Sequence, residues 1–80
     1  RKTASRKETK MKTVTIAEYT TMPGRFVVTG PARGQRRDTS DAGNAAAIAI
    51  NYANMTAGPC VIVGAKKVME LIPEEVRIKR

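Results

Sequence analysis

The segment that most constrains the fold is an alanine-rich stretch that runs from Ser40 to Pro59. Ser40 and Asp41 are both residue types that cap a helix N-terminus, because their side-chain oxygens accept hydrogen bonds from free backbone N–H groups. Ala57-Gly58-Pro59 predicts the stop, since glycine takes the left-handed C′ conformation and proline cannot continue a helix. We therefore expect one long helix, and a chain of 80 residues has room for a single small domain around it.

The expected helix has one face suited to packing on a sheet. Apolar residues recur along it at three- and four-residue steps, and the small alanines among them allow a close approach. These residues are Ala45, Ile48, Ala49, Tyr52 and Met55. Further alanines at positions 46, 47 and 53 either reflect good helix propensity or provide a second contact, such as one with a homodimer partner.

Before this helix, the chain has the pattern of a β-hairpin. Residues 12–19 alternate Val14 and Ile16 with threonine and alanine, which is typical of a half-buried strand. Residues 20–24 contain Pro-Gly and predict a turn, and residues 25–29 predict the return strand. The connection that follows, residues 30–40, is long for so small a domain and is expected to be a loop.

After the helix, the pattern predicts more β-structure. Residues 59–64 form an apolar run of the kind found in a central strand covered on both faces. Residues 65–72 have helical spacing, which favours a short helix, although the second arm of a hairpin fits the same residues. Residues 75–79 alternate and predict a final strand with a basic outer face. The expected fold is a single α+β domain over residues 13–80 with the order ββαβ(α)β.

Positive charge is concentrated in two segments. The chain has 15 Lys and Arg against 7 Asp and Glu, a net charge of +8. Residues 1–12 form a basic arm of net charge +5, and Arg33, Arg36 and Arg37 add +3 within the expected loop, while the other charges cancel. Clustered basic side chains on flexible segments suit a phosphate backbone, whereas a surface selected for solubility mixes the two signs.

The composition argues against catalysis. The chain has no histidine and a single cysteine, so Ser-His-Asp triads and cysteine-rich zinc sites are excluded. Cys60 adjoins an apolar run and is expected to be buried, and no pair of acidic residues has an obvious catalytic spacing. We expect neither enzymatic activity nor a cofactor or metal. Neither a membrane span nor a signal peptide is recognisable, which favours an intracellular location, cytoplasmic or nucleoid-associated, or a virion-associated one.

These features predict a module that binds nucleic acid, either DNA or RNA, through its phosphates. The arm is expected to supply salt-dependent affinity and the arginine loop to set the register. The expected contacts are Arg1, Lys2, Arg6, Lys7, Lys10, Lys12, Arg33, Arg36, Arg37, Arg77, Lys79 and Arg80. Base stacking is not expected, because Tyr19, Phe26 and Tyr52 fit the pattern of core residues.

A second hypothesis is a protein-interaction or assembly subunit, such as a virion component or a small inhibitor. Its basic arm would dock on an acidic protein, and its sheet edge or alanine-rich helix would pair with a neighbour or with a second copy. Small size and a basic arm are common among ribosomal, nucleoid-associated and phage proteins, which is a likeness of type only. Met11 is compatible with an internal start, so residues 1–10 are either native or a leader.

Overall fold

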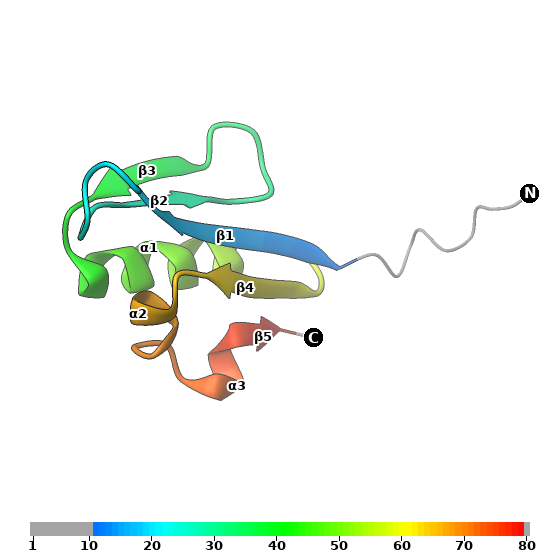
Figure 1. Ribbon diagram of the computed structural model, residues 1–80. Coiled ribbons are helices and arrows are strands. Elements are labelled where there is room, and N and C mark those ends of the chain that lie inside the picture. Colours follow the sequence, from blue (N-terminus) through cyan, green and yellow to red (C-terminus); the bar gives the residue numbers. More distant parts are fainter. Residues whose placement is uncertain (1–10, 80) are drawn as a thin grey trace, which may run out of the picture.

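A five-stranded sheet carries one long helix on a single face in the computed structural model, which describes residues 11–79 (Figure 1). In chain order the elements are β1 (Lys12–Glu18), β2 (Phe26–Thr29), β3 (Arg36–Thr39), α1 (Ala42–Met55), β4 (Cys60–Gly64), α2 (Lys66–Met69), α3 (Glu74–Arg77) and β5 (Ile78–Lys79). The predicted α+β class is confirmed. The expected order ββαβ(α)β fits, with one further strand, β3, ahead of the long helix.

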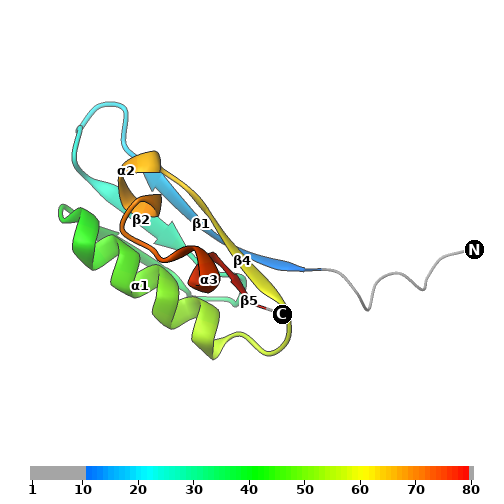
Figure 2. The same cartoon turned by 90° about the horizontal axis from the view of Figure 1, so that it is seen from below.

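The strands lie in the order β3-β2-β1-β4-β5. β1 is central: it runs antiparallel to β2 and parallel to β4, while β3 and β5 pair antiparallel at the two edges. The chain passes from β3 to β4 through α1, which lies along one face of the sheet (Figure 2). Because β1 and β4 are parallel and β2 is antiparallel to β1, the start of β1, the start of β4 and the β2–β3 turn share one end of the sheet (Figure 1).

The hydrophobic core lies between the sheet and the helices. The alternation predicted for β1 is confirmed, since Val14 and Ile16 are buried while the threonines between them are exposed. Phe26 and Val28 of β2 and Ile62 of β4 extend the same apolar layer. The remaining buried members of the core are Ala45, Ala46, Ala49, Ala53, Cys60, Val68 and Ile72.

Helix α1 begins where the sequence predicts. Asp41 is the N-cap, and its side chain accepts a hydrogen bond from the backbone N–H of Asn44 at 3.2 Å. The helix ends at Met55 with Thr56 as C-cap, and Gly58 takes a φ of +86° one position later than expected. The predicted stop is therefore correct, with a small shift in the place of the glycine.

The buried face of α1 is rotated from the predicted apolar stripe. Alanines alone form its fully buried part, while Ile48 and Tyr52 lie at its border and the side chain of Met55 is 65% exposed. The physical reason is the close approach of helix and sheet, which leaves room for a methyl group and moves larger side chains to the flanks. The prediction that Met55 packs on the sheet is wrong.

The connection predicted as a loop over residues 30–40 contains more regular structure. Residues 36–39 form β3, so only a short turn remains, closed by a hydrogen bond from Gly30 N to Gln35 O at 2.7 Å. Gly34 takes a φ of +85° in this turn, a conformation that favours glycine. Three of the four residues of β3 are charged, as is common for a strand at a sheet edge. The segment therefore has no apolar alternation, and its pattern predicts a loop.

Two expectations for the C-terminal third need correction. β4 is not covered on both faces, because every helix lies on the α1 side and the side chain of Val63 is 42% exposed. The predicted strand over residues 75–79 is mostly a helical turn, in which Pro73 O accepts a hydrogen bond from Val76 N at 2.9 Å. Only two residues of the predicted strand remain for β5. The preferred helix within residues 65–72 is confirmed as α2.

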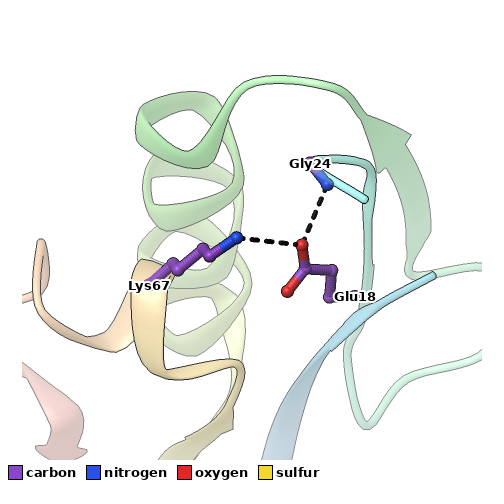
Figure 3. Close-up of polar contacts among 3 residues, drawn as sticks. All are labelled: Glu18, Gly24 and Lys67. Carbon is purple, nitrogen blue, oxygen red and sulfur yellow. Dashed lines mark hydrogen bonds and ion pairs between the residues drawn. The ribbon is translucent and has the colours of Figure 1, made fainter. Parts of the chain in front are cut away.

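The β1–β2 turn is fastened to α2 by Glu18 (Figure 3). Its Oε2 accepts a hydrogen bond from Gly24 N at 2.9 Å and lies 3.4 Å from Lys67 Nζ. The Gly24 hydrogen bond is the main reason that the pKa of Glu18 lies below its ordinary value; Lys67 adds to the effect and partial burial opposes it. One carboxylate thus holds the end of the sheet opposite to the β2–β3 turn.

Candidate functional site

The β2–β3 hairpin carries the net charge of the described structure. Residues 25–39 contain four arginines and one aspartate, a net charge of +3. The other charges within residues 11–79, five basic and five acidic, cancel. Within this described part of the chain, none of the four arginines forms an ion pair; the ion pair present joins Lys67 to Glu18. Among residues 11–79, the arginines of the hairpin therefore have no ion-pair partner.

The hairpin presents these arginines in several directions. Arg33 is exposed in the turn. Arg36 and Arg37 are consecutive in β3 and point to opposite faces, because Arg37 pairs with buried Val28 and Arg36 pairs with exposed Thr29. The three arginines predicted on a loop are thus mounted on a turn and a strand, and their backbone positions are set by the β2–β3 ladder.

The sheet face opposite α1 has no helix over it among residues 11–79, and we call it the open face (Figures 1 and 2). The strand register assigns to it alternate residues of each strand and the flanking positions. They are Thr13, Thr15, Ala17, Tyr19, Arg25, Val27, Thr29, Arg36, Asp38, Val61, Val63 and Ile78. Its β4–β5 half is aliphatic, with Val63 and Ile78 42% and 44% exposed, and its β2–β3 half is charged.

A polar cluster occupies the charged half of the open face. Tyr19 Oη donates a hydrogen bond to Asp38 Oδ2 at 2.5 Å, which joins the end of β1 to β3 across β2. This hydrogen bond is the main reason that the pKa of Tyr19 is raised, while the positive charges of Arg36 and Arg25 act in the opposite direction. The register places Arg25 opposite Tyr19, and Arg36 two residues before Asp38 on the same face of β3.

Sequence reasoning missed two members of this cluster. Tyr19 was expected in the core, but it is half-buried on the open face and outside the core cluster, whereas Phe26 is in the core and Tyr52 packs against it. Arg25 was counted among the balanced charges of the body, yet it lies opposite Tyr19, whose N–H donates to Arg25 O at 2.9 Å. The odd-numbered alternation of residues 13–19 was the signal that could have placed Tyr19 beside the threonines.

Two of the predicted contact residues donate hydrogen bonds within the molecule. Arg77 donates from Nε to Ile72 O at 3.0 Å and from Nη2 to Met69 O at 2.8 Å. Lys79 donates from Nζ to Ala53 O at 3.0 Å and to Thr56 O, at the C-terminal end of α1. Basic groups stabilise such helix ends because the last carbonyls lack partners and carry partial negative charge.

The base of the arm meets the β2–β3 turn. Lys12 is the first residue of β1, is exposed, and lines a cavity of about 140 Å³ together with Pro31, Ala32 and Gln35 of the turn. Met55, the last residue of α1, and the two residues after it, Thr56 and Ala57, also line the cavity. The other predicted contacts lie outside the described residues: Arg1, Lys2, Arg6, Lys7, Lys10 and Arg80.

No group of three or more His, Cys, Asp or Glu within residues 11–79 could hold a metal ion. No helix in that range is both long and apolar enough to cross a membrane. The predicted burial of Cys60 is confirmed, as its thiol lies in the core. The chain matches no known protein family and no curated protein.

Proposed function

We propose that this protein is a non-catalytic nucleic-acid-binding module that contacts the phosphate backbone through its basic arm and the β2–β3 hairpin. The observation that carries the proposal is the set of four hairpin arginines without an ion-pair partner among residues 11–79. Arginine presents a planar fork of donors that matches two phosphate oxygens at once. A strand and a tight turn hold the backbone of such groups in place more firmly than a loop does.

The position of the arm supports the same function. Residues 1–12 carry a net charge of +5 and lead into β1 at the end of the sheet where the β2–β3 turn lies. Lys12 and the turn line one cavity, so the two basic segments adjoin. A polyanion bound at the hairpin would therefore lie next to the arm, and its release of counterions would make the affinity fall steeply with salt.

The test compares two pairs of neutralising substitutions by fluorescence anisotropy, with mixed DNA and RNA at several salt concentrations. Replacing Arg36 and Arg37 by alanine should weaken binding and lower the slope of log K against log salt by about 1.5. Lys66→Ala with Lys67→Ala removes the same charge from exposed positions on α2, together with the Lys67–Glu18 ion pair, and should leave the slope unchanged once circular dichroism verifies the fold. Equal slopes for the two pairs, or no binding by the unmodified protein at low salt, would contradict the proposal.

One observation favours a second candidate, an assembly subunit. The outer surface of α1 has a shallow hollow that contains no charged residue; its lining is Ala47, Ile48, Ile50, Asn51 and Asn54. A second copy of α1 could pack there, because small and aliphatic side chains allow helices to approach. Light scattering of the full chain tests this candidate: a defined dimer that Ile50→Glu dissociates would support it, and a monomer at all concentrations would contradict it.

A further inference from the structure

We infer that the open face is the surface on which a single strand of nucleic acid lies, with phosphates at Arg25 and Arg36 and one base against Tyr19. The inference rests on the proposed nucleic-acid-binding function and names the form of its ligand. It adds a contact surface that the arm and the hairpin turn do not include. The argument comes from the width of this face, the order of its side chains and its charge.

The width of the open face favours a single strand over a duplex. Five strands spaced by about 4.8 Å span about 19 Å from edge to edge. The major groove of B-DNA is about 12 Å wide and admits a helix or a two-stranded ribbon, so the whole face does not fit into it. A single strand has no groove walls, and its bases and phosphates can both contact a broad surface.

The order of side chains across the face suits the two parts of a nucleotide. One row in register crosses four strands and passes from an aliphatic group through two hydroxyls to a guanidinium: Val63, Thr15, Thr29 and Arg36. Aliphatic groups can contact sugars and base faces, hydroxyls can donate to phosphates or base edges, and arginine binds phosphate. No residue of the described chain covers the aliphatic half of the face. In the inferred complex, sugars and base faces of the strand would contact it.

The polar cluster gives the charged half of the open face a net positive charge, which suits an anion. Asp38 is the acidic residue on the open face, and its Oδ2 accepts the hydrogen bond of Tyr19. Arg25 and Arg36 lie on the same face and their charges outnumber that of Asp38, so a phosphate near them meets a net positive surface. The same hydrogen bond holds the Tyr19 side chain in one place, which lowers the entropy cost of stacking a base on its ring.

The test uses the full chain, labelled 20-nucleotide single strands of dT and of U, and the matching duplexes, at low salt. Val63→Glu places a negative charge on the open face at an exposed position. Leu71→Glu makes the same kind of change at an exposed residue between α2 and α3, away from that face. Val63→Glu should weaken single-strand binding about tenfold, and Leu71→Glu less than about threefold, because only the first charge lies on the surface that the polyanionic strand contacts.

Tyr19 supplies a second, uncharged readout. Tyr19→Leu removes the ring and should weaken single-strand binding about tenfold, while Tyr19→Phe keeps the ring and should restore most of the affinity. Circular dichroism melting of each variant verifies that the fold is retained. Similar affinities for Tyr19→Leu and Tyr19→Phe would show that no base stacks at this position.

The outcomes separate this inference from the proposed function. If the unmodified protein binds neither single strands nor duplexes, the proposed function fails. If it binds, but Val63→Glu and Leu71→Glu weaken binding equally or duplex is preferred to single strand, the open-face inference is wrong and the hairpin and arm remain the interface. If light scattering shows a dimer that Val63→Glu converts to a monomer, the open face pairs with a second copy, which also overturns the inference.

Discussion

At the scale of single residues, several charged side chains of the described structure hold parts of the fold together. Glu18 ties the β1–β2 turn to α2, and Asp41 caps α1. Arg77 and Lys79 satisfy the carbonyls at the ends of α2 and α1. These groups have partners within residues 11–79, whereas the hairpin arginines form no ion pair there, and this difference separates structural charge from charge available to a ligand.

Glu18 should make stability depend on acid pH. Its pKa in the folded protein lies below the ordinary value of 4.5, so the ionised group stabilises the fold above that pH. This contribution is lost as the pH falls through the folded-state pKa. Glu18→Gln should lower the melting temperature at neutral pH and flatten its decline in acid, as measured by circular dichroism.

Glu70→Gln is the matched control, because Glu70 is exposed and its side chain makes no hydrogen bond within residues 11–79. This variant should melt as the unmodified protein does at each pH. If Glu18→Gln and Glu70→Gln give the same acid profile, the contacts of Glu18 with Gly24 and Lys67 do not contribute to stability.

At the scale of elements, the close contact of α1 with the sheet decides which residues are buried. The helix lies so near the strands that its fully buried positions are all alanine, and its larger apolar residues border them. Helical spacing alone does not distinguish these two sets, because both recur at three- and four-residue steps. The distance between layers makes the choice, and that distance follows from the packing of the whole sheet.

Enlarging a buried alanine should therefore be costly. Ala49 is fully buried between α1 and the sheet, so Ala49→Leu should destabilise the domain by about 1–3 kcal/mol through overpacking. In a domain of this size the melting temperature falls by roughly 4–8 °C for each kcal/mol. Ala47→Leu, at an exposed position of the same helix, should change stability by no more than about 0.5 kcal/mol. Equal melting temperatures would mean that the layers are not in close contact.

At the scale of the whole molecule, charge is distributed unevenly. The arm and the hairpin hold the excess positive charge, while the rest of residues 11–79 is neutral. Five of the six described acidic residues lie outside the hairpin, at the β1–β2 end, the start of α1 and the C-terminal segment. Under the proposed function, such a distribution would guide a polyanion to the arm and the hairpin.

The arm and the hairpin should therefore act additively on one ligand. Replacing Lys2, Lys7 and Lys10 by glutamine should lower the salt slope of nucleic-acid binding by about 2, and adding Arg36→Ala and Arg37→Ala should lower it by about 1.5 more. Arginine at the three arm positions keeps the charge and should preserve the slope. If the combined variant binds as the arm variant does, the two segments do not contact the same strand.

Several features followed from local sequence. The caps of α1, the alternation of β1, the β1–β2 hairpin and the burial of Cys60 were all predicted, because each depends on residues adjacent in the chain. The concentration of positive charge in an arm and a second basic segment also follows from the order of residues. For these features the chemistry of neighbouring residues is sufficient.

Tertiary structure decided the rest. A polar segment became an edge strand because β2 offers it hydrogen-bond partners, and its pattern carried no sign of this. Lys79 donates hydrogen bonds to the end of α1 because chain folding brings carbonyls such as Ala53 O, 26 residues away, within its reach. Arg25, Arg36 and Tyr19 gather on the open face because three strands lie side by side. Proximity between distant residues is a property of the assembled sheet, and no local pattern specifies it.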